Sequence, residues 1–481
     1  MDVVLEDRIS DLNDPIIHHI FSFLPIKNVV ATTVLSKRWN NLWISTPILN
    51  IHTCRKSDLS LTYDERTLRL LTGMRCEETC GLVIILNRML IPSTSAVPSN
   101  MTTIKKFHLK YHAYCEFEGR LFSISWIYKW ISNVVMRKVE EVTLSVGKGY
   151  ILPTCLFTCE TLTMLDIKMG GDLSSKIKKT GTFDFPQSFS LPRLKILHLM
   201  RMVFVDEDLS AQLFSNCPVL EELGLTHCYM VKKKVLCISV ASLKRLFITN
   251  SRTYSCKLNI HCPNLQSLTH SGIPDDYVEM EHGFSSLVNA DFNIAYELQR
   301  RKTRQCGLKN LIGGVSNVEF LTISGDTLKS LYLEHCLTEL PSFHNLRRLE
   351  VNSKSNRANA WAFFDLLHSL PNLELLVSTP GFHPKPDHCD FQRIRAPECV
   401  LLKLKAVEFR SLFCQQVELN IIKFFLANSL VLETMTLVFC PTSRQGRKDR
   451  FMKTVQMFPR ANTRNFVAFF FFPYFELAST T

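Results

Sequence analysis

The sequence PRLKILHL at Pro192–Leu199 sets a pattern that recurs along much of the chain. In this pattern two apolar residues flank a pair of mostly polar residues, and apolar and polar residues then alternate. The phrase returns as PVLEELGL at 218–225, PNLQSLTH at 263–270, HNLRRLEV at 344–351 and LVLETMTL at 430–437. Alternation of apolar and other residues has the period of a β-strand. Each copy therefore predicts a short strand.

The spacing of the copies indicates a repeat architecture. Successive copies begin 22 to 31 residues apart, a range that overlaps the leucine-rich-repeat period of roughly 20 to 29 residues. Weaker copies begin at Thr103, Lys138 and Glu160. The first apolar positions of the clear copies are Leu194, Leu220, Leu243, Leu265, Leu287, Val318, Leu346 and Leu373.

A single unit of this kind cannot bury its own apolar face, so neighbouring units must stack. The residues between strands, such as Asp208 to Phe214, have a helical pattern. We therefore expect an α/β fold in which a curved leucine-rich-repeat solenoid carries a parallel sheet on its concave side and helices on its convex side. Polar residues between the leucines, such as Lys195, His198 and Glu222, include those that project from the concave surface.

The N-terminal residues have helical rather than strand periodicity. Asn13 or Asp14 can cap a first helix, Pro15 suits its first turn, and Pro25 cannot continue it. Apolar residues one, three and four positions apart line one face of this helix: Ile16, Ile17, Ile20, Phe21 and Leu24.

Two further short helices fit the residues up to Trp43. One covers Lys27 to Thr33, and the next begins at a Ser36 cap and carries Trp39, Leu42 and Trp43. Fewer than 50 residues with so many large apolar groups cannot turn all of them inward, so some remain for a partner. The alternative is that the segment packs on the domain that follows.

The segment DRISDLNDPIIHHIFSFLPIKNVVATTVLSKRWNNLW at 7–43 resembles the F-box of plant proteins. Ile9, Ser10, Leu12 and Asp14 match the family's opening. The helix end and the close of the motif match at Ser22–Pro25, Leu35–Trp39, Leu42 and Trp43. One position departs from the family pattern, because Asn13 stands where the family has its opening proline.

The F-box of that family binds the adaptor subunit of a cullin-based ubiquitin ligase. The resemblance implies a Skp-type adaptor as partner, through it a cullin, and a target protein of unknown identity held by the repeats. It places five residues at or near the adaptor contact: Leu12, Ile16, Ile20, Leu24 and Pro25.

The C-terminal region continues the repeat logic. From Pro397 the pattern predicts a strand, a helix over Glu418–Leu426 and a strand over Leu432–Phe439. This stretch, with MFPRA at 457–461, resembles the FBD module that closes many plant F-box repeat proteins. The aromatic run Phe466–Phe475 departs from that module, and we expect a strand covered by the preceding helix.

Composition and charge distribution bear on the partners of the protein. The 481 residues carry a net charge of +12, but the three basic clusters at 232–234, 300–304 and 444–450 have no aromatic residues interleaved for base stacking. We expect solvated loops there; a nuclear-import signal and a nucleic-acid patch are the alternatives.

No stretch approaches the roughly 20 apolar residues that span a bilayer. Because no secretory start precedes the 17 cysteines, we expect reduced thiols and a cytoplasmic or nuclear location.

No pattern in the sequence indicates catalysis, a cofactor or a metal. The glycine pairs at 170–171 and 313–314 lack the lysine and spacing of a phosphate loop. His108 and His112, like Cys76 and Cys80, stand four apart, but no matching second pair completes a zinc site. The doublet His18–His19 has no neighbouring nucleophile and is predicted to lie on the solvated edge of the first helix.

The sequence thus predicts a binding protein and not an enzyme. We expect an F-box at 1–50, an entry segment at 51–100, leucine-rich repeats at 101–395 and an FBD-like region at 396–470. The leading function is that of a substrate-recognition subunit of a ubiquitin ligase. The alternatives are an interaction scaffold outside the ligase, a sensor that binds a small ligand on the concave face, and a nucleic-acid binder.

Overall fold

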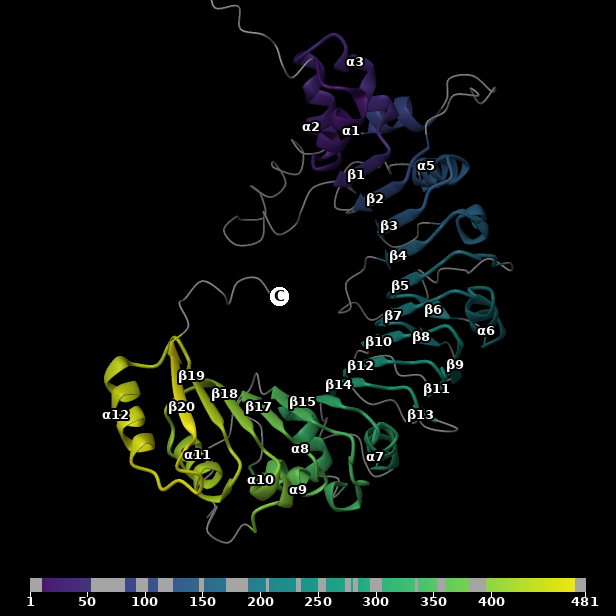
Figure 1. Ribbon diagram of the computed structural model, residues 1–481. Helices are drawn as coiled ribbons and strands as arrows, with labels where there is room; N and C mark the ends of the chain where they lie inside the picture. The colour runs from purple at the N-terminus through teal and green to yellow at the C-terminus, as the bar shows by residue number, and fades with distance from the viewer. Residues whose placement is uncertain are drawn as a thin grey trace, which may run out of the picture. The chain divides into compact units, whose positions relative to one another are not determined.

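The computed structural model describes residues 11–52, 83–91, 103–110, 124–146, 151–169, 189–204, 207–230, 235–249, 257–272, 278–279, 284–294, 305–333, 336–352, 360–379 and 395–471 (Figure 1). The chain forms two units, which are described separately. The first comprises residues 1–232 and 238–243, and the second residues 233–237 and 244–481. Most of the entry segment expected at 51–100, and the basic clusters at 232–234 and 300–304, lie outside the described residues.

The first unit begins with three short helices, as the sequence predicts. These are α1 (Asp14–Ser22), α2 (Ile26–Ala31), which runs into a 3-10 turn η1 (Thr32–Val34), and α3 (Trp39–Leu42) with η2 (Trp43–Ser45). The side chain of Asn13 accepts a hydrogen bond from the Ile16 N–H at 3.2 Å, so Asn13 and not Asp14 caps α1. The buried side of α1 presents Ile17 and Phe21, and the Phe21 ring meets Trp39 edge to face at 5.7 Å.

His18 does not lie on a solvated edge as predicted. It is half-buried, and its Nε2 lies 3.3 Å from the carbonyl oxygen of Leu42 and 3.2 Å from Ser45 Oγ. His18 therefore ties α1 to the segment that follows α3. Its neighbour His19 is exposed, as predicted for the pair.

A parallel sheet follows the helices in the first unit. Its strand order is β1-β2-β3-β4-β5-β7, so the strands neighbour each other in chain order (Figure 1). The remaining elements of this unit are β1 (Ile48–His52), β2 (Lys106–Lys110), α5 (Ile124–Met136), β3 (Glu141–Val146), η4 (Thr154–Thr158), β4 (Met164–Met169), β5 (Ile196–Met200), β6 (Val203–Phe204), α6 (Glu207–Ser215), β7 (Glu222–Thr226) and β8 (Tyr229–Met230).

The second unit has a parallel sheet built on the same plan, in the order β10-β12-β14-β15-β16-β17-β18-β19-β20. Strand β9 (Val235–Ser239) has residues in both units. The other elements are β10 (Arg245–Thr249), β11 (Lys257–His261), β12 (Ser267–Gly272), β13 (Val278–Glu279), β14 (Asn289–Ile294), α7 (Gln305–Gly313), β15 (Phe320–Ser324), α8 (Gly325–Leu333), η6 (Leu337–Glu339), β16 (Arg348–Asn352), α9 (Ala360–His368), β17 (Leu375–Thr379), α10 (Glu398–Leu402), β18 (Ala406–Leu412), α11 (Gln416–Asn428), β19 (Thr434–Phe439), α12 (Gln445–Gln456) and β20 (Phe466–Phe471).

The repeat leucines form the core of each unit, as predicted. Every first apolar position, from Leu194 to Leu373, is at most 3% exposed. Each lies two residues before the first residue of its strand. Within the strands, alternate residues point into the same core, for example Leu349 and Val351 of β16. The residues between them lie on the opposite side, here called the open face of the sheet.

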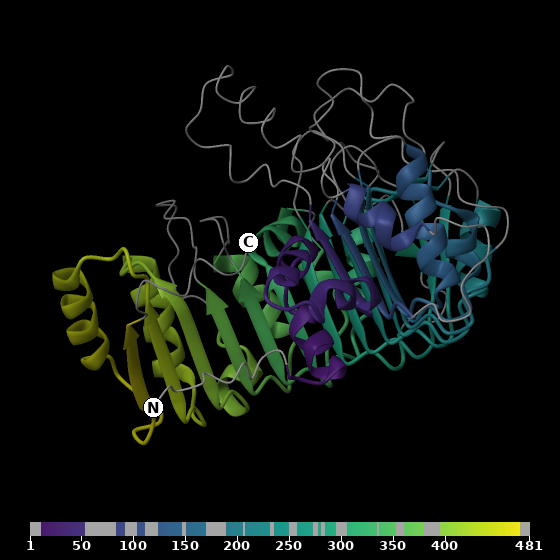
Figure 2. The same ribbon diagram turned by 90° about the horizontal axis from the view of Figure 1, so that it is seen from above.

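The layer behind the sheet is not helical throughout. In the second unit α7 to α11 gather on one side of the sheet, away from the open face (Figures 1 and 2). Among the described residues from β10 to β14, however, short strands β11 and β13 pair in parallel in place of helices. These repeats are spaced only 22 residues apart. After the sheet strand and its turns, too few residues of such a repeat remain to form a helix on the other side. A helix uses more residues than an extended strand to cover the same distance.

The C-terminal strand β20 forms as predicted, but the preceding helix covers it only in part. Phe439 of β19 stacks on Phe469 at 6.2 Å and meets Phe451 of α12 at 5.9 Å. Phe466, Phe470 and Phe471 are nevertheless 49–66% exposed. Residues 472–475 of the aromatic run lie outside the described part of the chain. No helix among the described residues is long and apolar enough to cross a membrane.

Ten cysteines of the described residues form no disulfide. Cys217, Cys262 and Cys336 are buried. Burial raises the pKa of Cys217 to about 12, so this thiol stays protonated and behaves as a small apolar group.

A buried threonine joins α8 to the neighbouring strand. Helix α8 follows β15 without a loop, and Thr327 in its first turn is fully buried. The Thr327 hydroxyl accepts a hydrogen bond from the Ile294 N–H at 2.7 Å and donates to the Phe292 carbonyl at 3.0 Å. One side chain thus satisfies two backbone groups at the end of β14.

Replacing Thr327 with valine should lower the free energy of unfolding by about 2 kcal/mol, because the shape is kept while a buried N–H loses its acceptor. Urea unfolding followed by circular dichroism measures the change. Thr434→Val, at an exposed strand position, is the control and should change stability by less than about 0.5 kcal/mol. Equal stabilities of the two variants would show that the Thr327 hydrogen bonds contribute nothing.

Candidate protein-binding surfaces

The helices α1 to α3 leave a set of large apolar side chains on the surface. Two of the residues predicted for adaptor contact, Ile16 and Ile20, are 46% and 37% exposed. They are four residues apart on α1 and therefore lie on one side of the helix, while Ile17 and Phe21 are buried. Two apolar sides on one short helix indicate that one packs internally and the other is available to a partner.

The other three predicted contact residues flank this side of α1. Pro25 is exposed, and Leu12 and Leu24 are half-buried. Leu12 precedes the Asn13 cap, and Leu24 and Pro25 follow the last turn of α1. The structure thus brings Ile16 and Ile20 together on one helix and places the remaining three at its two ends.

Sequence reasoning missed three more exposed apolar residues in this segment. Phe23, Val34 and Leu35 are 73%, 87% and 60% exposed. Val34 and Leu35 are consecutive apolar residues between short helices, and adjacent residues in such a turn cannot both face one small core. That pattern was the available signal. An exposed ion pair between Arg38 and Asp14 links the start of α1 to the segment before α3.

The second candidate surface is the open face of the sheet in the second unit. Because paired residues of parallel strands lie on the same side, the printed registers define rows across the strands. One row runs Phe320, Arg348, Leu375, Ala406, Thr434 and Phe466. The next runs Asp291, Thr322, Glu350, Val377, Glu408 and Thr436.

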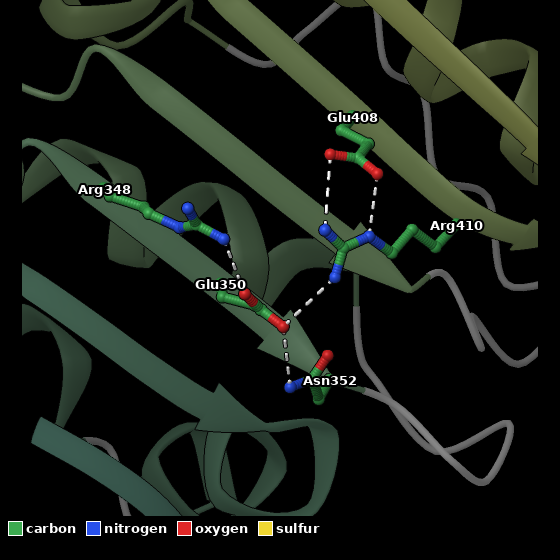
Figure 3. Close-up of polar contacts among 5 residues, drawn as sticks. All are labelled: Arg348, Glu350, Asn352, Glu408 and Arg410. Atoms are coloured by element: carbon green, nitrogen blue, oxygen red, sulfur yellow. Dashed lines mark hydrogen bonds and ion pairs between the residues drawn. The ribbon is translucent and has the colours of Figure 1, made fainter. Parts of the chain in front are cut away.

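Five polar side chains on β16 and β18 form a connected network on this face (Figure 3). Glu350 accepts hydrogen bonds from Arg348 at 3.2 Å, Asn352 at 3.1 Å and Arg410 at 3.5 Å. Arg410 also holds Glu408 through two nitrogens, at 2.8 and 3.4 Å. This two-point contact fixes the guanidinium plane.

Arg410 reaches across the intervening strand β17. It joins Glu408 of β18 to Glu350 of β16, and Val377 of β17, which lies in the same row between them, is only 1% exposed. The arginine side chain and its partners therefore cover this apolar residue of the open face, as long basic side chains commonly do.

Asp291 of β14 lies at the edge of this network. Burial and the negative charge of Glu350 raise the pKa of Asp291. No cation within ion-pair distance of Asp291 is found among the described residues. The side of the network toward β14 is thus acidic, whereas the two arginines lie toward β16 and β18.

The open face of the first unit is also polar. The register resolves which residues project: His198 of β5 and Glu222 and Gly224 of β7 do, whereas Lys195 and Glu221 precede the strands. His198 Nε2 lies 2.8 Å from Glu222 Oε1. A Cβ on Gly224 would come within 2.8 Å of the His198 ring, so glycine makes room for the imidazole.

Two further side chains on this face are those of His108, whose pKa is shifted, and Asp166, which is buried. Burial and the nearby charges of His52 and Lys110 lower the pKa of His108, so this ring is neutral at pH 7. Asp166 is buried and pairs with Lys168 at 3.0 Å. Among the described residues no three histidine, cysteine or acidic side chains are grouped so as to hold a metal ion. The arrangement suits hydrogen bonding to another protein.

Comparison with known proteins adds three family matches. Residues 9–50 match the F-box domain, residues 127–282 match the repeats described as "FBD-associated F-box protein At5g56370, LRR repeats", and residues 392–437 match the FBD. The exposed apolar side of α1 falls within the F-box match, and β18 within the FBD match, whereas β15, β16 and β17 lie between the matched segments.

Whole-chain relatives come from Arabidopsis thaliana. The chain is 30% identical to "Putative F-box/LRR-repeat protein At5g41840" over 414 residues, which cover 79% of this chain and 70% of that protein. It is 27% identical to "F-box/FBD/LRR-repeat protein At1g78750" over 479 residues, which cover 95% of each.

Proposed function

Because this chain belongs to the F-box/LRR-repeat family, we propose that it is the substrate-recognition subunit of a cullin-based ubiquitin ligase of the SCF type. Its F-box helices bind a Skp-type adaptor and through it a cullin, and its repeat sheet holds a target protein for modification by neighbouring subunits. The observation that carries the proposal is the exposed apolar side of α1, formed by Ile16 and Ile20, in the segment that matches the F-box.

The proposed adaptor contact consists of Leu12, Ile16, Ile20, Leu24 and Pro25. Burial of such exposed apolar groups against a partner stabilises the complex by about 25 cal/mol per Å² of apolar surface removed from water. Phe23, Val34 and Leu35, which are still more exposed, extend the candidate contact.

Asn13 supports the same contact indirectly. It stands at the family's proline position, yet it caps α1 through the Ile16 N–H. The cap fixes the first turn of the helix and with it the position of Ile16. The departure from the family pattern thus retains a defined helix start.

Ile20→Asp is expected to weaken adaptor binding at least tenfold, about 1.4 kcal/mol, because a carboxylate at a buried apolar contact loses its hydration. The measurement is calorimetric titration of the full chain with a purified Skp-type adaptor. Ile151→Asp is the matched control: it makes the same substitution at an isoleucine that is 65% exposed outside the F-box, and it should bind like the wild type.

The two possible failures of this experiment have different meanings. Wild-type affinity in Ile20→Asp would show that Ile20 lies outside the contact. No binding by the wild-type chain would remove the ligase role and favour an interaction scaffold outside the ligase.

The alternative of a small-ligand sensor has less support. A cavity of about 220 Å³ at the strand starts is lined by polar and charged residues such as Glu319, Arg347 and Glu374, unlike the apolar pockets that enclose small ligands.

A further inference from the structure

The network on β16 and β18 leaves its arginines with donors to spare. A guanidinium has five N–H donors, of which Arg348 uses one and Arg410 three within the network. The carboxylates are closer to saturation, because Glu350 accepts three hydrogen bonds and Glu408 two. The arginine side chains are 39% and 37% exposed, against 19% for Glu350 and 30% for Glu408. The most exposed charged groups of this network are therefore cationic donors.

Exposed phenylalanines lie on the same face at both ends of the network. Phe320 of β15 is 40% exposed and pairs in register with Arg348. Phe466 of β20 is 66% exposed and lies in the same row, and Phe470 is 53% exposed four residues further along β20. The row thus runs from an aromatic residue past an arginine to a second aromatic residue.

Strand β20 is the last strand in the sheet order among the described residues. Edge strands are usually protected by charged residues or proline, but the sequence FVAFFF at Phe466–Phe471 contains neither. An aromatic edge next to an exposed aromatic face is a surface that a partner is expected to cover.

The row has the dimensions of a short peptide. Neighbouring strands are about 4.8 Å apart, so the five strand spacings from Phe320 to Phe466 measure about 24 Å. An extended chain advances about 3.3 Å per residue and covers this length with about eight residues. A segment lying across the strands can therefore touch both phenylalanines and the arginines between them.

We propose that the open face of β15 to β20 binds an extended acidic segment of the target protein, with carboxylates on Arg348 and Arg410 and apolar side chains on Phe320 and Phe466. This inference rests on the proposed function only in identifying the partner as the ligase target. Asp291 makes the side of the face toward β14 acidic. The carboxylates of the bound segment are therefore expected to lie over β16 to β18 and not over β14.

The charges of this face favour a protein segment over nucleic acid. Glu350, Glu408 and Asp291 lie in one row and would repel a continuous phosphate backbone, which carries a charge at every nucleotide. A peptide can instead place one or two carboxylates at the arginines and apolar groups elsewhere. A guanidinium–carboxylate contact of this kind is directional and adds specificity.

The test uses the full-length chain to select binders from a phage library of random ten-residue peptides. We expect enrichment of peptides that carry Asp or Glu together with Phe, Leu or Trp about seven residues apart. The selected peptide, measured by fluorescence anisotropy, should bind Arg348→Gln and Phe466→Ser at least tenfold more weakly than the wild type. Arg245→Gln is the matched control, because Arg245 lies on the same face but on β10, and it should bind normally.

Several outcomes would overturn the inference: enrichment of basic peptides, no enrichment over Arg348→Gln, or tighter binding of a ten-nucleotide single strand than of the selected peptide. Sedimentation showing a dimer that Phe466→Ser dissociates would assign the face to a second copy of the chain. Adaptor titration with Arg348→Gln separates this from the proposed function, since the F-box is unaltered and adaptor affinity should stay unchanged.

Discussion

Phe425→Ala is expected to lower the free energy of unfolding by about 3–5 kcal/mol, the usual cost of removing a fully buried aromatic ring. Phe425 of α11 is inaccessible to solvent. Its ring centroid lies 6.0 Å from Phe409 of β18, 6.2 Å from Phe364 and 6.4 Å from Phe363 of α9. The ring therefore joins two helices to the sheet, and a cavity at this point cannot close by moving one side chain.

Urea unfolding of the full chain, followed by circular dichroism, measures this effect. Phe466→Ala makes the same substitution at a ring that is 66% exposed, and we expect it to change stability by less than about 1 kcal/mol. A loss for Phe425→Ala no larger than for Phe466→Ala would show that the aromatic cluster is not part of the cooperative core.

His270 should make the protein sensitive to mild acid. It occupies a core position on β12, between Ile248 of β10 and Phe292 of β14 in the register, where a repeat normally places an aliphatic residue. It is 2% exposed, its Nε2 has no hydrogen-bond partner in the described part of the chain, and burial lowers its pKa from 6.5 to about 4. The cause is burial alone, because the charged ring cannot be hydrated there.

The sign of the pH effect follows from this lowered pKa. Above pH 6.5 the ring is neutral in both folded and unfolded chains, so its full contribution to stability is present. As the pH falls from 6.5 to 4, the unfolded chain takes up a proton that the folded chain refuses, and stability is lost. The expected loss is about 3 kcal/mol.

His270→Leu is the comparison that isolates this effect. Urea unfolding at a series of pH values should show the wild type losing about 3 kcal/mol more than His270→Leu between pH 7 and pH 4. Burial raises the pKa of Glu418 to about 7, which acts in the opposite direction, but Glu418 is present in both proteins and cancels. Parallel curves for the two proteins would contradict the assignment of His270 to the dry core.

The sequence by itself determined the parallel sheet and the three N-terminal helices. The repeat leucines predict burial because an apolar residue that recurs every 22 to 31 residues just before a strand can only face a shared core. Leu194, Leu346 and Leu373 all do so. The helix signals were equally local: Asn13, Pro15 and Pro25 act on their own backbone or on the next turn, so α1 could be bounded without any knowledge of the fold.

The tertiary structure alone decided which residues of separate repeats meet on the open face of the sheet. Glu350 and Arg410 are 60 residues apart in the chain, and only the register of β16, β17 and β18 brings them together. Alternation within one strand cannot specify such a pair, because it fixes which residues share a side and not which strands become neighbours.

His270 has the polarity of a surface residue but occupies a core position, since packing of the neighbouring repeats overrides the preference of one side chain. The exposure of Phe23, Val34 and Leu35 is likewise a property of the folded helices, because a small core has room for only some of the apolar residues that its sequence supplies.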